Sequence, residues 1–341
     1  MSISIAYGRM QHMTTSFWNT VKKPILALAP MANVTDAAFR RVIAKYGKPD
    51  VMWTEFVSAD GLVSAGREHL LVDLLYSESE RPIVAQLFSG NPRKMYEAAK
   101  LVKKLGFDGL DINMGCPDRS IEKSGAGAAL IRNPNLARAV LRSAKEGAGG
   151  LPVSVKTRLG YNKDVLEDWL PELLEEKPAA VTIHARTRKE MSKVPAHWDR
   201  VKRAVEIRDA MKSDALIVGN GDVVGIDDAT RKAKETGADG TMLGRAIFGN
   251  PFLFAKQKGE LRIMSYDLRK KLEILVEHTR LFQKLLGKHK SFAIMKKHFK
   301  AYVEGFDRAK ELRMRLMETE NADEVEDCIK AFLAAHSIGR S

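Results

Sequence analysis

Apolar and polar positions alternate in blocks along the first 255 residues of the chain. Short apolar runs lie at 25–31, 51–56, 83–88, 109–114, 152–159, 180–185, 215–222 and 240–247, with helix-like stretches between most of them. Most runs are continuously apolar, as is typical of parallel strands that are covered on both faces. Eight strands with helical crossovers in about 230 residues have the size and rhythm of a (β/α)8 barrel. The pattern therefore predicts an α/β fold, a TIM barrel.

A doubly wound parallel sheet is the alternative fold. It is disfavoured because no glycine-rich nucleotide fingerprint follows the first run, and GNGDVVG at 219–225 misses the G-x-G-x-x-G spacing. Two helix boundaries are also marked in the sequence. Thr35 is expected to cap a helix that runs to Tyr46, and Pro92 is expected in the first turn of another that reaches Leu105.

The alternation of strands and helices stops after Phe254, and residues 266–336 carry helix-like patterns without a strand run. We therefore expect a barrel domain over 1–255 and an all-helical domain over 256–341. Segment 284–300, KLLGKHKSFAIMKKHFK, has six lysines and no acidic residue. On a helix, Phe292, Met295, Phe299 and Val303 would share one face, and Lys296, Lys297 and Lys300 another. The lysine face is either solvated surface or a phosphate contact.

Composition and charge narrow the class of protein. The 341 residues carry a formal net charge of +13, which favours either a polyanionic partner or a merely basic surface. Two cysteines argue against a disulfide framework and for a reducing compartment. No run of 18 apolar residues occurs, so we expect no membrane span and a cytoplasmic protein.

Polar side chains gather where the predicted strands end, which is where (β/α)8 barrels place their chemistry. Nearly every end carries one, whereas the strand bodies are apolar; the ends bear Glu55, Gln86, Asn113 with Cys116, Lys156 with Arg158, His184 with Arg186, Asn220 with Asp222, and Arg245. The sequence therefore predicts an active site at this end of the barrel.

The last two strand ends, GNGD (219–222) and LGRA (243–246), are small glycine-containing turns, each expected to lead into a helix. Exposed backbone N–H groups beside a helix N-terminus form an anion site, and such sites recur after strands seven and eight of this fold. Arg245 would add a forked donor for a phosphate group. The turns therefore indicate a phosphorylated ligand; the alternative is glycine used for tight packing.

Two further side chains leave alternatives open. Lys156 ends an apolar run, where an unpaired charge is costly to bury. Three roles are therefore open for it: a Schiff-base nucleophile, a partner of a bound anion, or a surface lysine that extends its ammonium into solvent. Cys116 stands between Gly115 and Pro117, where a strand opens into a loop. A lone cysteine is usually a buried structural residue, and we assign that role to Cys328.

Several segments of the sequence match a known pattern. They are DINMGCP followed by KSGAGAAL, which is highly specific, together with APMANVTDAAFR, PIVAQLFSGNP, VSVKTRLGY, TIHARTR, VGNGDV, ADGTMLGRAIFGNPFLF and AIMKKHFKAYVEGF. Through these segments the sequence resembles the tRNA-dihydrouridine synthase family over residues 25–310. The usual HGRTR of the family appears here as HARTR, at 184–188. The loop that follows it, 189–201, matches only loosely.

The resemblance implies that the protein reduces the 5,6 double bond of a specific uridine in tRNA. FMN would be the cofactor and NADPH the reductant, with a hydride going from reduced flavin to C6. Cys116 would supply the proton at C5, since a thiol is still protonated at neutral pH. Residues 120–127 could then form a mobile lid, with Gly125 and Gly127 as hinges.

The resemblance also assigns residues to the cofactor and the substrate. The cofactor residues it implies are Pro30, Met31, Ala32, Gln86, Lys156, His184, Asn220, Gly221, Asp222, Gly244 and Arg245. The substrate residues are Asn113 and Arg186, and we add Lys296, Lys297 and Lys300 from the lysine face. We expect tRNA as partner, no membrane, no metal, and a monomer.

Two other classes of function compete with this one. A dihydroorotate-dehydrogenase-like flavin barrel would act on a free pyrimidine and would need no basic helical domain. A non-enzymatic RNA-binding protein on a decayed barrel should have lost Cys116 or Lys156, and both are present.

Overall fold

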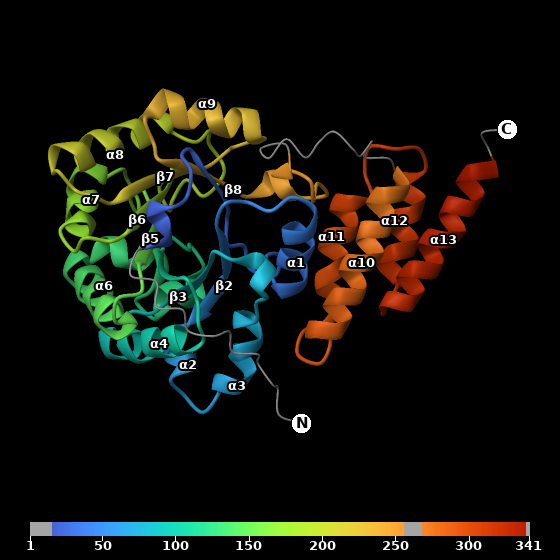
Figure 1. The fold of residues 1–341 in the computed structure, drawn as a ribbon, viewed down its shortest axis with the longest axis horizontal. Coiled ribbons are helices and arrows are strands. Elements are labelled where there is room, and N and C mark those ends of the chain that lie inside the picture. The colour runs from blue at the N-terminus through green and yellow to red at the C-terminus, as the bar shows by residue number, and fades with distance from the viewer. Residues whose placement is uncertain (1–15, 256–267, 339–341) are drawn as a thin grey trace. The chain divides into compact units, whose positions relative to one another are not determined.

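A computed structural model describes residues 16–255 and 268–338 (Figure 1). The chain divides into two compact units, which we describe separately. The first unit contains the residues up to Met31 and residues 49–244, and the second contains residues 32–48 and the chain from Arg245 onward. The predicted domain boundary after residue 255 adjoins a segment outside the described residues and stays a prediction.

Eight parallel strands form the centre of the first unit. They are β1 (Ile25–Leu28), β2 (Met52–Ser58), β3 (Ile83–Phe88), β4 (Gly109–Met114), β5 (Val153–Arg158), β6 (Ala180–His184), β7 (Leu216–Asn220) and β8 (Gly240–Leu243). Neighbours in sequence pair from β2 to β8, β8 also pairs with β1, and a parallel bridge between Ala27 and Val51 joins β1 to the start of β2. The predicted eight strands and the TIM-barrel fold are confirmed.

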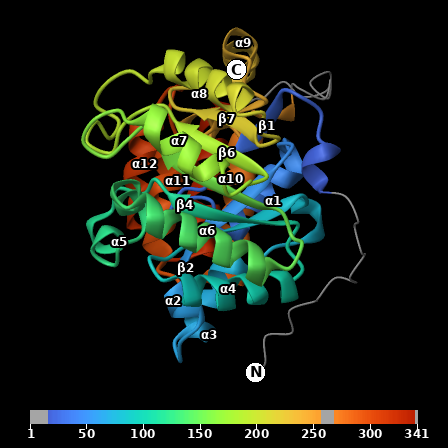
Figure 2. The ribbon, with the colours of Figure 1, turned by 90° about the vertical axis from the view of Figure 1, so that its left-hand side faces the viewer.

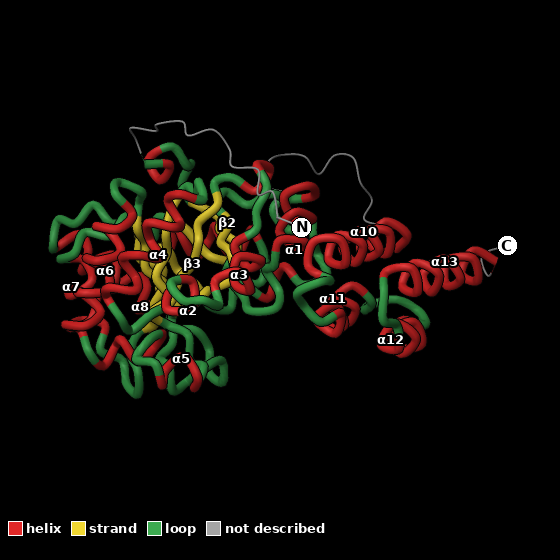
Figure 3. The backbone as a smooth tube through the Cα atoms, turned by 90° about the horizontal axis from the view of Figure 1, so that it is seen from below, coloured by secondary structure: helices red, strands yellow, loops and turns green. Residues whose placement is uncertain are grey.

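Helices cover the outside of these strands (Figures 2 and 3). They are α4 (Pro92–Lys104), α6 (Pro134–Ala148), α7 (Leu166–Leu174), α8 (Trp198–Ala210) and α9 (Ile226–Thr236). The short helices α2 (Ala59–Leu62) and α3 (Arg67–Leu70) lie in the connection after β2, and α5 (Arg119–Lys123) lies in the connection after β4. Pro92 begins α4 as predicted, because a proline at the first helical position loses no intrahelical hydrogen bond.

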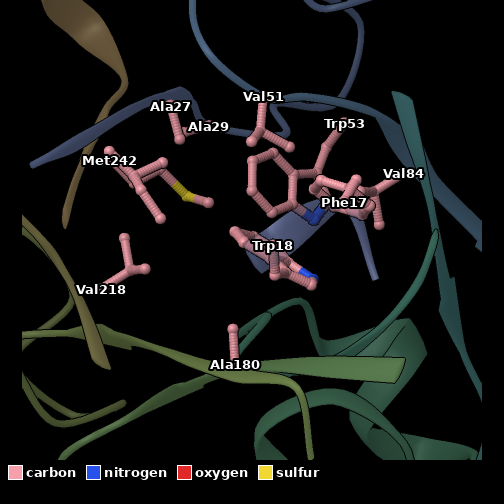
Figure 4. Packing of buried hydrophobic residues seen from close by; sticks show 11 residues of the cluster. Phe17, Trp18, Ala27, Ala29, Val51, Trp53, Val84, Ala180, Val218 and Met242 are labelled. Carbon is pink, nitrogen blue, oxygen red and sulfur yellow. The ribbon is translucent and has the colours of Figure 1, made fainter. Parts of the chain in front are cut away.

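An aromatic plug lies against the amino-terminal ends of the strands. Phe17 and Trp18, in the 3-10 helix η1 (Phe17–Asn19), are 5% and 4% exposed and belong to a hydrophobic cluster with residues of β1, β2, β3, β6, β7 and β8 (Figure 4). Trp18 also packs on Trp53 of β2, with ring centroids 6.0 Å apart. Phe17 and Trp18 therefore form part of the buried core of the barrel.

The second unit is helical in its described part. It contains α1 (Ala37–Tyr46), the 3-10 helices η5 (Arg245–Ile247) and η8 (Phe292–Ile294), and then α10 (Leu268–Leu286), α11 (Met295–Tyr302), α12 (Ala309–Glu318) and α13 (Ala322–Ile338). No strand occurs within residues 268–338, which confirms the helical region expected after the barrel. Met295, Phe299 and Val303 are fully buried, whereas Lys297 and Lys300 are exposed and Lys296 is half-buried.

One local prediction, the cap of α1, is corrected. Asp36, not Thr35, caps α1: its Oδ1 accepts a 2.9 Å hydrogen bond from the N–H of Phe39, while the carbonyl of Thr35 accepts from Arg40. Both side chains are good caps, and the aspartate stands one residue nearer the first turn. The two glycine turns lead into helices as expected, into α9 after β7 and into the short 3-10 helix η5 after β8.

Candidate active site

The turn that carries Cys116 is fixed by the last residues of β4. Asn113 Oδ1 accepts hydrogen bonds from the N–H groups of Gly115 and Cys116, at 3.1 and 2.8 Å. A Cβ atom at Gly115 would lie 3.2 Å from the carbonyl carbon of Thr157, so the tight approach to β5 favours glycine. The strand end therefore presents Cys116 at a defined place on the barrel rim.

The Cys116 thiol is half-buried and is not in a disulfide. Burial raises its pKa above the ordinary value, and the charge of Asp118 raises it further. A hydrogen bond from the Asp118 backbone, together with the nearby cations Arg158 and Lys156, opposes this effect without reversing it. The thiol is therefore protonated at neutral pH, which suits a proton donor and not a nucleophile.

Lys156 lies beside Asn113 in the register of β4 and β5. Its ammonium has no hydrogen bond or ion pair among the residues that the structure describes. Burial and repulsion by Arg158 lower its pKa to about 8, while attraction to Asp111 and Cys116 opposes the shift. Lys156 is therefore mostly charged at neutral pH, and its role among the three that the sequence leaves open stays a prediction.

Three buried polar residues lie side by side on β3, β4 and β5, two positions before Asn113 and Lys156 on β4 and β5. Gln86, Asp111 and Ser154 are register neighbours on β3, β4 and β5, and each is at most 2% exposed. Gln86 Nε2 donates to Asp111 Oδ2 at 2.6 Å, and Ser154 Oγ donates to Asp111 Oδ1. Burial raises the Asp111 pKa to about 6. The sequence prediction missed Asp111, although a carboxylate inside the apolar run GLDINM was a visible signal.

The ends of β6 and β7 are joined through an ion pair. Arg186, only 2% exposed, pairs with Asp222, and its Nε donates to the carbonyl of Val194 at 2.6 Å. Its Nη1 lies 3.3 Å from His184 Nε2. Asn220 Nδ2 donates to the carbonyl of Met242 at 2.8 Å. The structure thus brings Arg186, Asp222 and His184 together, and the separate roles of these residues and of Asn220 toward cofactor and substrate stay predictions.

The two predicted glycine turns differ in how strictly they require glycine. Gly221 has φ +129°, and a Cβ atom there would lie 2.9 Å from Ala196 Cβ and 3.4 Å from His184 Cδ2. A Cβ at Gly244 would make only ordinary contacts, 3.7 Å from Ala29 and from Met31. The turn after β7 is therefore the one shaped by close approach.

The remaining predicted cofactor residues lie on both sides of the division between the units. Pro30 and Met31 follow β1 in the first unit, and both are half-buried. Ala32 and Arg245 belong to the second unit. Their contacts with a cofactor stay predictions.

An ion pair also ties the segment after Cys116 to the loop after β6. Arg188 Nε and Nη2 donate to the two carboxylate oxygens of Glu122, at 2.8 and 2.5 Å. Arg188 also lies over the ring of Tyr161, at 5.2 Å from the centroid. The sequence assigned no role to Glu122 or Arg188, because residues 66 positions apart share no local pattern.

The described part of the chain lacks both a metal cluster and a membrane-spanning helix. No group of three or more His, Cys, Asp or Glu side chains with the geometry of a metal site occurs in residues 16–255 and 268–338. Within the same ranges, none of the helices combines the length and the apolar character needed to cross a membrane.

Solved structures share the fold of this chain at low sequence identity. A histamine dehydrogenase from Rhizobium sp. 4-9 aligns with a TM-score of 0.52 and 15% identity, over 75% of this chain and 48% of that one. A 2-naphthoyl-CoA reductase aligns with a TM-score of 0.53 and 11% identity, over 71% of this chain and 52% of that one. These likenesses support the barrel fold.

Sequence relatives are much closer. A probable tRNA-dihydrouridine synthase of Staphylococcus aureus (strain MRSA252) is 38% identical over 325 residues, covering 94% of this chain and 97% of the relative. The probable tRNA-dihydrouridine synthase 2 of Bacillus subtilis (strain 168) is 38% identical over 323 residues, with the same coverage. The family model for dihydrouridine synthase (Dus) matches residues 27–337. The chain therefore belongs to the dihydrouridine synthase family.

Proposed function

We propose that this protein reduces the 5,6 double bond of a uridine in tRNA, with FMN as cofactor and NADPH as reductant. The observation that carries the proposal is that the protonated thiol of Cys116 lies near the ammonium of Lys156, which has no partner among the described residues. Cys116 follows β4 and Lys156 lies on the neighbouring β5, close enough for each to influence the pKa of the other. The names of the relatives agree with this reaction.

The residues present fit FMN. Lys156 offers a positive charge that has no partner among the described residues, and the turn at Gly221 is held close to Ala196 and His184 at the end of β7. Lys156, Gln86 and the turn at 220–222 would hold the isoalloxazine and phosphate groups, together with Arg245. When bound, reduced FMN would supply the hydride at C6 of the uracil. Lys156 would offset the negative charge of the reduced cofactor, because its ammonium is mostly charged at neutral pH.

Cys116 would donate its Sγ proton to C5 of the uracil. Its raised pKa keeps the proton on sulfur at neutral pH until the base is in place. The thiolate that remains would be reprotonated from solvent, so the thiol is restored after each turnover. Arg158 and Lys156 would stabilise this thiolate, since both cations lower the thiol pKa.

Asn113 would contact the uracil. Its Oδ1 is used by two backbone N–H groups and one Nδ2 hydrogen by Gln86, which leaves one Nδ2 hydrogen without a partner in the described residues. A uracil within folded tRNA would have to be flipped out to reach it. Lys296, Lys297 and Lys300 would contact the tRNA backbone. The enzyme would act as a cytoplasmic monomer without a metal.

The proposal is tested with tRNA from a strain that lacks dihydrouridine. The purified protein, supplied with NADPH, should convert a defined uridine to dihydrouridine, as measured by nucleoside mass spectrometry, and acid should release FMN. Release of FAD or a sugar phosphate would contradict the cofactor assignment. Reduction of free pyrimidines with no reaction on tRNA would favour the dihydroorotate-dehydrogenase-like alternative.

A further inference from the structure

A continuous chain of hydrogen bonds runs from a buried carboxylate to a buried guanidinium through the Cys116 turn. Gln86 Nε2 donates to Asp111 Oδ2 at 2.6 Å, and Asn113 Nδ2 donates to Gln86 Oε1 at 3.1 Å. The N–H of Cys116 donates to Asn113 Oδ1 at 2.8 Å. The carbonyl of Gly115, which belongs to the same peptide group as that N–H, accepts from Arg158 Nε at 2.7 Å.

All three amide groups in this chain point the same way. The two side-chain amides and the Gly115–Cys116 peptide each turn their N–H toward Asp111 and their oxygen toward Arg158. A backbone N–H can only donate and an ionised carboxylate can only accept, so the two ends demand the same orientation of the amides between them. Asp111 and Arg158 therefore determine the direction of the hydrogen bonds between them.

Neither Asp111 nor Arg158 forms an ion pair within the described residues, although Lys156 is near enough to lower the pKa of Asp111. Asp111 is fully buried, and its carboxylate also accepts a hydrogen bond from the Ser154 hydroxyl. Arg158 is 7% exposed, and its other bonds go to the carbonyls of Thr187 and Met191. No carboxylate of the described residues lies within ion-pair distance of Arg158. Aligned dipoles between opposite charges strengthen one another in a medium of low dielectric constant.

We propose that Asp111 and Arg158 are positioning residues that fix the orientation of the Gly115–Cys116 peptide, and hence the direction of the Cys116 thiol, through this chain. Neither residue touches the thiol through a hydrogen bond. Rotating the peptide would break its bonds to Asn113 and Arg158 together, which leaves one orientation of the turn. The consequence of this positioning for the reaction rests on the proposed function, in which Cys116 is the proton donor.

The test measures alkylation of Cys116 by iodoacetamide in the purified full-length protein, as a function of pH. The plateau rate at high pH reports the position and access of the thiolate, and the apparent pKa reports the charges around it. Cys328, buried in α13, is the internal reference for general unfolding. The variants are Asp111→Asn, Arg158→Lys and Arg158→Met. The matched control is Ser154→Ala. It removes a hydrogen bond to the Asp111 carboxylate, but Ser154 is not a member of the chain of hydrogen bonds between Asp111 and Arg158.

Asp111→Asn should raise the plateau rate at Cys116 by about tenfold, because a freed turn exposes a half-buried thiolate. Arg158→Met should do the same and also raise the apparent pKa, while Arg158→Lys keeps the charge and should lie nearer the wild type. Ser154→Ala should leave the rate unchanged. The double variant Asp111→Asn/Arg158→Met should equal one single variant, because either change already breaks the chain.

Equal effects of Asp111→Asn and Ser154→Ala would overturn the proposal, as would single effects that multiply in the double variant. If Asp111→Asn does not fold, the two Arg158 variants decide: equal plateau rates at the wild-type value would overturn the proposal. Alkylation needs neither tRNA nor proton transfer. Failure of the proposed function is therefore seen separately: no dihydrouridine forms in tRNA, or its formation survives the removal of Cys116.

Discussion

The carbonyl of Cys116 accepts a 3.0 Å hydrogen bond from the backbone N–H of Ala128. This bond closes the segment that contains α5 back onto the strand end from which it starts. Gly127, next to Ala128, has φ +59°, and a Cβ atom there would lie 2.8 Å from the same carbonyl. The residue expected as a hinge of a lid therefore packs directly against the backbone of the proposed proton donor.

Gly127→Ala should consequently disturb Cys116. The added methyl group must displace the Cys116 carbonyl, so we expect the rate of tRNA-dependent oxidation of the reduced flavin to fall at least about tenfold. Reduction of the flavin by NADPH should stay unchanged. Gly125→Ala is the matched control, because Gly125 also has a positive φ, +75°, but nothing lies within 4 Å of its Cβ position. Equal losses in both variants, measured by stopped-flow absorbance, would point to backbone strain alone.

The barrel could be predicted from the sequence because strands covered on both faces leave a direct signal. Each of the eight strands lies within or overlaps one of the eight apolar runs, most of which are continuous. The strand ends were also visible, because polar residues such as Asn113 and His184 interrupt those runs. Local physics determines both features, so no knowledge of distant contacts was needed.

The contacts within the site could not be predicted in the same way. Arg186 and Asp222 pair across 36 positions of sequence, and Arg158 binds the carbonyl of Gly115 across 43. No periodicity encodes such contacts, because they depend on how loops from different strands meet. The grouping of α1 with the C-terminal helices could not be predicted for the same reason, because α1 lies between β1 and β2 in sequence and far from those helices.

Lys156→Met should slow reduction of the flavin by NADPH, because it removes the charge proposed to offset the reduced cofactor. The pKa of Lys156 is about 8, so its ammonium is present below that pH and lost above it. The wild-type reduction rate should accordingly fall as pH rises through about 8, and this step should be absent from the variant. Lys163→Met, at an exposed position in the loop after β5, is the control. A pH step that persists in Lys156→Met would assign it to another group.

Replacing Lys296, Lys297 and Lys300 together by Glu should weaken tRNA binding and lower the slope of its salt dependence by up to about three, one for each phosphate that is no longer neutralised. FMN content should stay unchanged. The control is the triple replacement of Arg93, Lys100 and Lys104 by Glu, which makes the same charge change on the surface of α4. Equal tRNA binding by the two triple variants at several salt concentrations would show that the lysine face is only solvated surface.

The helical unit should lose stability in acid through two buried histidines. His278 of α10 and His298 of α11 are at most 1% exposed, and their rings lie 4.5 Å apart against Phe39. Burial lowers both pKa values, that of His298 to about 3. Both imidazoles are therefore neutral in the folded protein. Their titration takes nothing from the free energy of unfolding above pH 6.5, the ordinary pKa of histidine.

Below that pH, each histidine should lower the free energy of unfolding by about 1.4 kcal/mol per pH unit. For His298 the loss continues until the pH reaches its folded-state pKa of about 3. His298→Phe keeps an aromatic ring and cannot be protonated, so its Tm should fall less steeply than that of the wild type as the pH drops below 6.5. Thermal unfolding followed by circular dichroism measures this slope, and parallel curves for the two proteins would contradict the prediction.

Cys116→Ala should separate the two halves of the proposed reaction. The substitution removes the acid but leaves the cofactor residues in place, so reduction of FMN by NADPH should proceed near the original rate. Oxidation of the reduced flavin by tRNA should fall by roughly two to four orders of magnitude, the usual contribution of a positioned acid. Cys116→Ser should do little better, because a hydroxyl is a much weaker acid than a thiol. Cys328→Ala, in the helical unit, should affect neither half-reaction. Stopped-flow absorbance of the flavin measures both halves, and equal slowing of the two, or no slowing of either, would make Cys116 a structural residue.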